Sequence, residues 1–414
     1  MNAQKSKREN FYGKIPNYWA NMYGQEYSLY DVYRISEEEE TRIKTATEKI
    51  AQVFFKICGL LRNVGDETLM QMGFPRETLK FIKLKTIRAE SVISRLDLVK
   101  VKDTYCVMEI NSDTPTFIKE LFHINGLVCD EFNLVNPNEK EEERLGKEIR
   151  TAIEEAYSKL EKRNFPNIVF TSHDENEEDK YTVKYLQEIA GVPSKYVPLE
   201  ELRIIEGEGL IDPDGDIIDV LYRQTFPIES LILDKDPDTG SKVGLQLLEL
   251  VKENKLAFIN PPSAFLLQTK AVQAVIWGLH EENSDFFTEE EHQWIHTHFL
   301  PTYLEEETFL QNRVPYIKKP CFGREGDTIE IYDDKGSKIV EDPNKSYTDY
   351  LAVYQKYVEL PKTSFRTENG TLDGHIMVGC FLLNGKPSAF GYRVGNRITD
   401  NLSYFLPVGI ENIV

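Results

Sequence analysis

The most regular alternation of hydrophobic and polar residues in this chain lies on either side of the triplet Lys102-Asp103-Thr104. Successive side chains of a strand point to opposite faces of a sheet, so each run predicts an amphipathic strand. Three polar residues are a common connection between antiparallel strands, so the two runs predict a hairpin. This connection sets Asp97 opposite Glu109 and Arg95 opposite Asn111 on one polar face.

The two faces of this predicted hairpin differ in chemistry. Leu96 and Leu98 lie opposite Ile110 and Met108 on the apolar face. The polar face offers an amide oxygen and two carboxylates, which we expect to be exposed. Such oxygen ligands are the kind that Mg²⁺ takes together with water and substrate phosphate. The guanidinium of Arg95 suits a phosphate or a carboxylate. A solvated, salt-bridged face is the alternative, and the alternation does not separate the two.

Helical and strand periods elsewhere predict a mixed α/β (α+β) protein. Ser36 followed by Glu39 is typical of a capping box, and we expect the helix that starts there to continue to about Leu61. After a helical region, a βαβ unit is predicted, with its central helix ending at Gly191. The predicted elements are a helical region over 139–162, a strand over 167–171, a helix over 179–190 and a strand over 194–198.

The C-terminal part of the chain is predicted to be rich in antiparallel strands. Gly323 and Gly336 fall in turns of a small sheet, and Asn384-Gly385 is a strong hairpin signal. The predicted elements are helices over 245–253 and 268–280, a short strand over 257–259, and strands over 314–318, 328–332 and 338–341. The polar stretch 234–242 is predicted to be a surface loop.

Two motifs with the residue types of metal sites have structural interpretations that we favour. Asp212-Pro-Asp-Gly-Asp has its glycine at the fourth position, whereas an EF-hand loop needs it at the sixth, so we predict a polar turn. His292, His296 and His298 include a pair four residues apart that could bind zinc. They lack a glutamate between them and a distant ligand cluster, so we predict packing or surface histidines.

Composition narrows the class of protein. With 414 residues the chain is long enough for two or three subdomains, and its net charge of −20 argues against nucleic acid or an anionic membrane as the main partner. No run resembles a signal peptide or a membrane span, so we expect a cytoplasmic protein. Five cysteines without a CxxC pair favour reduced, buried thiols.

Candidates for nucleotide binding must be sought outside the familiar motifs, because the sequence holds no Walker A, GxGxxG or nucleophile elbow. The segment 319–326, KPCFGREG, has bare backbone amides and a cation on each side, which suits a mobile flap over phosphates. An ordinary β-turn is the alternative. Lys270 opens a helix after a proline loop and would add its charge to that helix N-terminus. A solvent-facing lysine is the alternative there.

Six segments, in order and spacing, resemble the glutathionylspermidine synthase family of ATP-grasp ligases, and the similarity runs from about Tyr18 to the C-terminus. The segments are SRLDLV, MEINSDTPT, YLQEIAG, NPPSAFLLQTKA, YIKKPCFGREG and GYRVGNRITDNLSYFLPV. The resemblance implies a pre-ATP-grasp (Rossmann-like) domain and an ATP-grasp core with a small lid. It also implies ATP and Mg²⁺ as cofactors, and C–N bond formation through an acyl phosphate.

The resemblance also implies roles for individual residues. Asp97, Glu109 and Asn111 match the magnesium ligands of the family, and Arg95 matches the arginine that orients the reacting carboxylate. The residues that match its ATP-binding positions are Lys270, Lys319, Arg324, Glu325, Gly326, Gln355, Tyr357 and Arg393.

The sequence matches the family less closely at the positions that bind substrate than at the positions that bind ATP. Thr114 and Thr116 match positions that touch a thiol-peptide substrate, and Glu177 with Glu178 matches an acidic doublet at the amine site. At 222–224, Tyr-Arg-Gln stands where we expect different chemistry, so we expect glutathione with spermidine to be a poor pair.

The implied organisation has three parts. Residues 1–160 hold an N-terminal helical region and the metal hairpin, residues 161–262 a pre-ATP-grasp-like βαβ domain, and residues 263–414 the lid and core of the ATP-grasp unit. Because the chain begins directly at the synthetase, we expect a stand-alone enzyme without the amidase domain of bifunctional members, and no hydrolase activity is implied.

The function implied by the resemblance is that of an ATP- and Mg²⁺-dependent ligase that joins a glutathione-like carboxylate to a polyamine-like amine. Its expected partners are small-molecule substrates, with no nucleic acid and no membrane, in a monomer or homodimer. One alternative is a nucleotide-binding protein of the same fold that acts as a regulator or assembly partner without turnover. Another is a carboxylate-based metallohydrolase, which would need no nucleotide.

Overall fold

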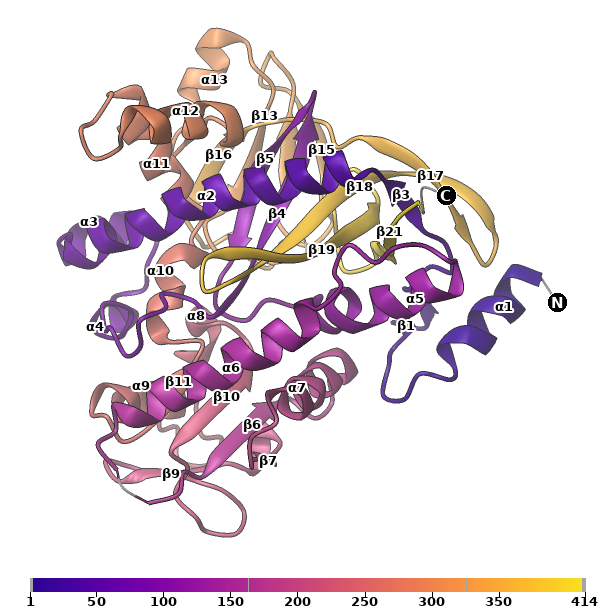
Figure 1. Ribbon diagram of the computed structural model, residues 1–414. Coiled ribbons are helices and arrows are strands. Elements are labelled where there is room, and N and C mark those ends of the chain that lie inside the picture. The colour runs from indigo at the N-terminus through magenta and orange to yellow at the C-terminus, as the bar shows by residue number, and fades with distance from the viewer. Residues whose placement is uncertain (1–2, 163, 325, 412–414) are drawn as a thin grey trace.

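Three β-sheets organise the chain, which the computed structural model describes over residues 3–162, 164–324 and 326–411. Figure 1 shows a parallel four-stranded sheet in the lower part of the molecule and two antiparallel sheets, of six and five strands, above it. The predicted metal hairpin lies in the six-stranded sheet, and the predicted glycine-bounded flap follows a strand of the five-stranded sheet.

The six-stranded sheet joins segments far apart in the sequence. The central strand β18 pairs with β4 on one side and with β19 on the other. The strands are, in order, β20 (Tyr404–Leu406), β19 (Lys386–Gly395), β18 (Gly370–Leu383), β4 (Ile93–Val101) and β5 (Thr104–Asn111), and β17 (Lys362–Thr367) also pairs with β18. The predicted hairpin at Asn384-Gly385 is the β18–β19 turn, in which both residues have positive φ.

The β4–β5 hairpin pairs its polar residues as predicted. Arg95 lies opposite Asn111 and Asp97 lies opposite Glu109, with Leu96 between them on the buried apolar face. A slip of one residue would have moved this whole set to the other face of the sheet. The common-face prediction is therefore confirmed.

The connection of this hairpin differs from the prediction. The turn has two residues, Lys102-Asp103, and Leu98 pairs with Val107 rather than with Met108. A β-bulge leaves Met108 as the extra residue and restores the expected offset beyond it. The prediction of a three-residue loop was wrong. The pairing of Asp97 with Glu109, which that loop was expected to produce, arises from the two-residue turn together with the bulge.

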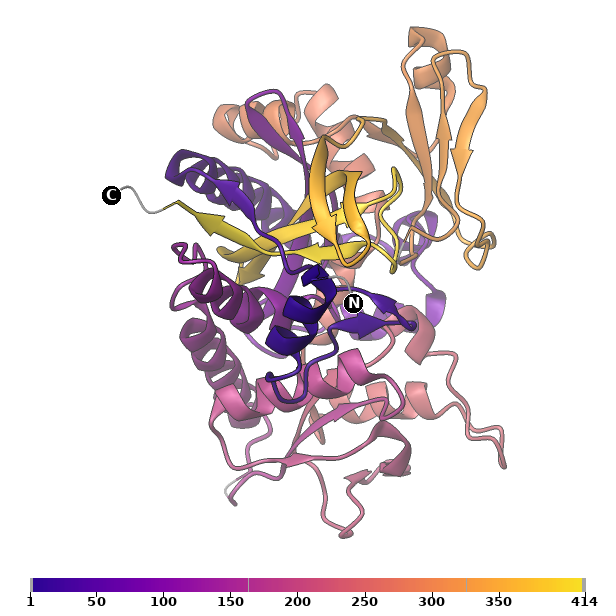
Figure 2. The ribbon, with the colours of Figure 1, turned by 90° about the vertical axis from the view of Figure 1, so that its right-hand side faces the viewer.

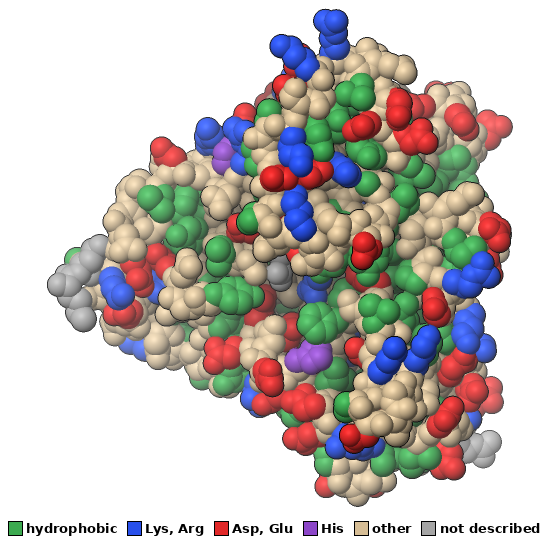
Figure 3. Space-filling model, turned by 180° about the vertical axis from the view of Figure 1, so that it is seen from behind, with side chains coloured by type: hydrophobic (Ala, Val, Ile, Leu, Met, Phe, Trp, Pro, Cys, Tyr) green, Lys and Arg blue, Asp and Glu red, His purple; other side chains and the backbone are tan. Residues whose placement is uncertain are grey.

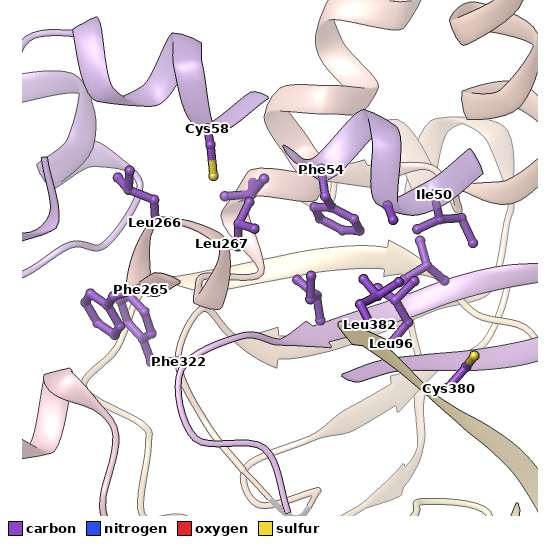
Figure 4. Packing of buried hydrophobic residues seen from close by; sticks show 14 of the residues in the cluster. Ile50, Phe54, Cys58, Leu96, Phe265, Leu266, Leu267, Phe322, Cys380 and Leu382 are labelled. Carbon is purple, nitrogen blue, oxygen red and sulfur yellow. The ribbon is translucent and has the colours of Figure 1, made fainter. Parts of the chain in front are cut away.

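Helix α2 (Glu37–Asn63) crosses the six-stranded sheet (Figure 1) and supplies much of the main core. Figure 4 shows Ile50 and Phe54 of this helix packed over Leu96 and Leu382 of the sheet. The side chain of Ser36 caps the helix by accepting the N–H of Glu39. The predicted capping box is only half formed.

The side chain of Glu39, which would complete the capping box, binds residues of the sheet instead. The carboxylate of Glu39 accepts hydrogen bonds from Lys100 and Tyr105 of the β4–β5 hairpin. Glu39 therefore takes part in the helix cap through its backbone N–H and connects the first turn of the helix to the sheet through its side chain.

The parallel sheet contains the predicted βαβ unit. Its strands are, in order, β11 (Ala257–Ile259), β10 (Val220–Gln224), β6 (Ile168–Ser172) and β7 (Lys195–Tyr196). The crossover helix α7 (Glu177–Ala190) begins two residues before the predicted start because Asn176 caps it by accepting the N–H of Asp179. It ends at Gly191 in the left-handed conformation, as predicted. Helices α6 (Glu141–Ser158) and α9 (Val243–Lys252) also belong to this part of the molecule.

The five-stranded sheet forms a projecting lobe, seen at the upper right of Figure 2. Its strands are, in order, β12 (Thr302–Tyr303), β16 (Ala352–Lys356), β13 (Tyr316–Pro320), β14 (Glu330–Tyr332) and β15 (Lys338–Glu341). The predicted antiparallel sheet is confirmed, and β12 and β16 are additional strands. Helices α11 (Ala271–Glu281), α12 (Glu289–His298) and α13 (Glu307–Asn312) accompany it.

The remaining elements are short and frame the larger ones. The helical elements are α1 (Ala3–Tyr12), α3 (Asp66–Gln71), α4 (Leu79–Ile82), a π-helical turn (Glu120–Ile124), α5 (Asn125–Glu131), α8 (Ile228–Leu231) and α10 (Phe265–Gln268). The short strands are β1 (Asn21–Met22), β2 (Gln25–Glu26), β3 (Tyr33–Ile35), β8 (Arg203–Ile205), β9 (Gly209–Ile211) and β21 (Val408–Ile410). Among the described residues, no helix is long and apolar enough to cross a membrane.

The motifs that resembled metal sites have structural roles. The backbone N–H groups of Asp214 and Asp216 bind the carboxylate of Asp212, and the ammonium of Lys195 lies 2.6 Å from that carboxylate. The aspartate motif is thus the predicted polar turn, and the ammonium of Lys195 contacts all three of its carboxylates. His298 is buried with its Nδ1 2.9 Å from a backbone carbonyl oxygen, in agreement with a packing role.

Candidate active site

A cleft brings together residues of the six-stranded and five-stranded sheets. Most of the predicted site residues line it, although they come from segments separated by up to about three hundred residues. Those lining the cleft are Arg95, Asp97, Glu109, Asn111, Thr114, Thr116, Lys270, Lys319, Arg324, Gly326, Gln355, Tyr357 and Arg393. Glu325 lies outside the described residues.

At the inner wall of the cleft, Arg95 and Asp97 form a buried ion pair. Two hydrogen bonds join them, from Nε to Oδ1 at 2.6 Å and from Nη2 to Oδ2 at 3.0 Å. Arg95 also donates to the carbonyl oxygen of Thr116 at 2.8 Å. The side chains are only 7% and 6% exposed, so the expectation of an exposed carboxylate was wrong for Asp97. The bulged hairpin turns this face toward a cleft that the five-stranded sheet covers.

Glu109, across the hairpin from Asp97, faces two lysines. Its carboxylate lies 3.2 Å from the ammonium of Lys270. Burial by itself would raise the pKa of Glu109, but the charges of Lys270 and Lys319 outweigh this effect and lower the pKa to about 2. Glu109 is therefore a permanent anion in this cleft at neutral pH.

The donor set on the hairpin fits a hard divalent cation. Two carboxylates and the amide of Asn111 line one cleft, and the amide nitrogen of Asn111 lies 3.3 Å from Asp97. This arrangement leaves the amide oxygen of Asn111 available as a ligand. Oxygen donors of this kind match Mg²⁺ better than a softer metal.

Two lysines also line the cleft. Lys270, whose ammonium lies 3.2 Å from Glu109, also donates to the carbonyl oxygen of Gly323 at 3.1 Å and so connects the β4–β5 hairpin to the predicted flap. Lys319 is buried and donates to the side chain of Gln355 at 2.9 Å. Burial lowers the pKa of Lys319 to about 8, even though the nearby charge of Glu109 opposes this effect.

Gln355 has a positioning role in this structure. Its amide nitrogen donates to Gln273 and to Thr302, so its oxygen is directed at the ammonium of Lys319. Tyr357, two residues further along the chain, lines the cleft with a hydroxyl that is buried and has no hydrogen-bond partner among the described residues. Apolar side chains complete this end of the cleft: Met108, Leu300, Ile317, Val358, Leu360 and Met377.

The predicted flap closely approaches the loop between β19 and β20. Gly326 has φ +75°, and a Cβ atom there would lie 2.7 Å from Ile398 and from the carbonyl oxygen of Thr399. Only glycine fits this position without strain. Arg324 of the same loop and Arg393 of β19 both line the cleft, and Arg393 donates to the carbonyl oxygen of Asp400 at 2.6 Å.

Glu177 and Glu178 lie apart from the other predicted residues, in a second cavity at the start of α7. Its wall also includes Trp19, His173 and Phe226, and most of its charged side chains are acidic. Burial, and then the charge of buried Glu120, raise the pKa of Glu178 to about 8. The charges of two arginines that line the main cleft act in the opposite direction, which links the two cavities electrostatically.

The segment 222–224, where different chemistry was expected, supports the wall of the cleft. The guanidinium of Arg223 binds buried Asp113 at 2.5 Å, and Gln224 donates to the carbonyl oxygens of Thr114 and Pro115. These bonds fix the loop that carries the two predicted substrate threonines. Arg223 and Gln224 lie at the carboxyl end of strand β10 and therefore position that loop.

Sequence reasoning missed Glu120, a fully buried acid on the π-helical turn. Its Oε1 accepts the hydroxyl of Tyr27 at 2.7 Å, whereas its Oε2 has no partner among the described residues. No spacing motif marks such a residue, and the signal that could have found it is the acid itself within an apolar stretch, PTFIKELF.

Comparison with known proteins agrees with this geometry. The sequence profile described as "Glutathionylspermidine synthase preATP-grasp" matches residues 3–411. A putative acid–amine ligase of Haemophilus influenzae is 24% identical over 320 residues, which covers 73% of this chain and 70% of that protein. A glutathione synthetase-like effector from Globodera pallida has a similar structure, with a TM-score of 0.54, 13% identity and coverage of 93% of this chain and 90% of that one.

These similarities bear on the fold and on the family. The structural likeness supports the ATP-grasp type of α/β fold that the sequence predicts, which is thereby confirmed. The profile spans nearly the whole chain. The chain therefore belongs to the glutathionylspermidine synthase family.

Proposed function

We propose that this protein is an ATP- and Mg²⁺-dependent ligase that joins a carboxylate to an amine through an acyl phosphate. The acid is expected to be a glutathione-like peptide or an amino acid, and the amine to be polyamine-like. The observation that carries the proposal is the convergence of Arg95, the oxygen donors of the hairpin and two lysines in one cleft. A metallohydrolase would have no use for the lysines and the glycine flap.

The nucleotide would lie along the five-stranded sheet. Lys270 and Lys319 are placed to bind its phosphates, and the backbone amides around Gly326 would cover them. Asp97, Glu109 and Asn111 would hold Mg²⁺, which when bound neutralises charge on the phosphates. The purine would occupy the apolar end of the cleft beside Tyr357.

The acid would bind between Arg95 and the loop with Thr114 and Thr116. The guanidinium of Arg95 is fixed by its bonds to Asp97 and to a carbonyl oxygen, so it is oriented before substrate arrives. Such a preorganised charge stabilises the carboxylate as it attacks the γ-phosphate, and loss of one such group typically costs about 10²- to 10³-fold in rate.

The amine would enter through the second cavity. Figure 3 shows one face of the molecule, on which acidic side chains are numerous around a central hollow. The cavity around Glu177 and Glu178 has the acidic and aromatic character that suits an ammonium group. It lies at the carboxyl ends of strands β6 and β10, the usual ligand edge of a parallel sheet.

A substrate screen tests this proposal. Candidate acids and amines are combined with ATP and Mg²⁺, ADP release is measured, and the condensed product is sought by mass spectrometry. The proposal expects ADP release that requires both the acid and the amine. ADP release without condensed product, or ATP binding without any release in the whole screen, would favour a nucleotide-binding protein without ligase turnover.

A further inference from the structure

Three histidines meet where helices α11 and α12 lie side by side (Figure 1). His280 lies in the last turn of α11, and His292 and His296 lie four residues apart on α12. Nδ1 of His280 is 2.9 Å from Nδ1 of His292, and the ring centroids of His280 and His296 are 6.0 Å apart. His298 of the same sequence motif packs inward. The distant histidine that the spacing of this motif did not reveal is His280.

The hydrogen bonds of His292 fix the position of its proton. Its Nε2 lies 3.1 Å from the backbone carbonyl oxygen of Ser284, which can only accept, so Nε2 carries the proton. Nδ1 of the neutral ring is then an unprotonated nitrogen that faces His280, whose Nδ1 donates to it. A histidine that donates one N–H to a backbone carbonyl and keeps its other nitrogen free has the arrangement of a metal ligand.

The two facing rings are half-buried and held by aromatic neighbours. Trp277 packs edge-on against His280, and Phe287 packs edge-on against His292. Burial, and then the charges of the other two histidines, lower the pKa of His280. The neutral ring that a metal ion requires is therefore its main form at neutral pH.

The charges around the three histidines suit a cation. The segment 281–290, which joins the two helices, holds five acidic residues and no lysine or arginine. Lys56 of helix α2 lies over the ring of Phe287, and its charge is paired with Glu291 at 2.5 Å. A bound cation would thus lie beside an acidic connection and a lysine whose charge is already balanced.

We propose that His280, His292 and His296 form a binding site for a divalent transition metal ion of the Zn²⁺, Ni²⁺ or Cu²⁺ class. Two nitrogen ligands of such an ion lie about 2.9 to 3.4 Å apart, from square-planar to tetrahedral geometry, and the two Nδ1 atoms already have this separation. The ion replaces the proton between these nitrogens, and that proton leaves to solvent.

His296 supplies the third ligand after a change of rotamer. The nitrogens of the three rings do not all lie within 4.8 Å of one another, but the His296 ring is exposed and free to turn toward the pair. Imidazole nitrogen favours these ions, whereas Mg²⁺ favours oxygen, so this site differs in chemistry from the hairpin cleft.

Ni²⁺ uptake by tag-free protein in excess Mg²⁺ tests the proposal, because Mg²⁺ occupies the sites made of oxygen ligands. Equilibrium dialysis with elemental analysis should find one Ni²⁺ ion per chain. His280→Gln, His292→Gln and His296→Gln should each weaken this binding by at least about tenfold, since even outer partners of a metal site contribute that much. His375→Gln is the matched control and should bind like the parent, because this half-buried histidine binds a backbone carbonyl oxygen rather than another histidine.

Thermal denaturation provides a second readout in case a substitution disturbs folding. An ion held between α11 and α12 binds the folded chain, so Ni²⁺ should raise the melting temperature of the parent and of His375→Gln but not of His280→Gln. The proposal is overturned if the parent takes up no Ni²⁺ in excess Mg²⁺, or if any of the three substitutions leaves the affinity unchanged. Neither measurement uses ATP or substrate, so both are independent of the proposed function.

Discussion

Arg95 and Asp97 are two residues apart on one strand, and each is the principal hydrogen-bond partner of the other, at 2.6 and 3.0 Å. The roles proposed for them, binding the substrate carboxylate and binding the metal, draw on the same two side chains. A cation at Asp97 would share that carboxylate with the guanidinium, and the bond from Arg95 to the carbonyl oxygen of Thr116 would help to keep Arg95 oriented for the acid. The pair therefore connects the two halves of the proposed site.

Replacing Asp97 should affect both stability and activity. Asp97→Ala leaves the buried guanidinium of Arg95 without its carboxylate, and breaking a buried pair in this way typically costs about 3 kcal/mol or more of unfolding free energy. Urea denaturation should show a lower midpoint, and acid- and amine-dependent ADP release should be abolished. Asp103→Ala, in the exposed turn of the same hairpin, should change neither. An unchanged midpoint for Asp97→Ala would contradict the ion pair.

The ammonium of Lys319 gives a pH dependence to nucleotide binding. Burial lowers its pKa to about 8, so its charge is present at pH 7 and is lost as the pH rises through 8. ATP affinity, measured by calorimetry, should therefore fall above pH 8, by up to about tenfold per pH unit. In Lys319→Arg the charge persists and the affinity should stay level over the same range. A parent protein whose affinity is level from pH 7 to 9.5 would exclude Lys319 from phosphate binding.

Gly326 should be required for nucleotide binding. In Gly326→Ala the new methyl group meets Ile398 and the carbonyl of Thr399 at 2.7 Å, so the flap must move away from its present position. We expect the KM for ATP to rise several-fold with a smaller effect on the KM for the acid. Gly336→Ala is a matched control, because it has the same kind of backbone strain in a turn of the same lobe, away from the cleft. Equal effects of the two substitutions on the KM for ATP would argue against a flap.

The sequence predicts part of this site, and the limits of that prediction are physical. Alternation of side chains places Asp97 and Glu109 on one face, but a period of two does not distinguish an extra loop residue from a bulge at Met108. Local pattern also carries no information on burial by a distant segment. The cover over the hairpin comes from strands around residue 320, so the burial of Asp97 was not foreseen.

The amine side was less predictable for the same reason. Glu177 and Glu178 are recognisable as an acidic doublet at a helix start, but the cavity in front of them is completed by Trp19 and Phe226 from remote segments. Glu120 belongs to no motif, and only tertiary packing shows that one of its carboxylate oxygens has no partner among the residues that the structure describes. Local sequence patterns do not identify residues whose role arises from tertiary packing.

The most direct test of the central claim follows the oxygen atoms of the acid. The most active acid of the substrate screen is labelled with oxygen-18 in its carboxylate, and the phosphate released with ATP and amine is examined by mass spectrometry. An acyl phosphate transfers one carboxylate oxygen to phosphate when the amine displaces it, so labelled phosphate is expected in amount equal to the amide. Unlabelled phosphate accompanying full amide formation would contradict the acyl-phosphate mechanism.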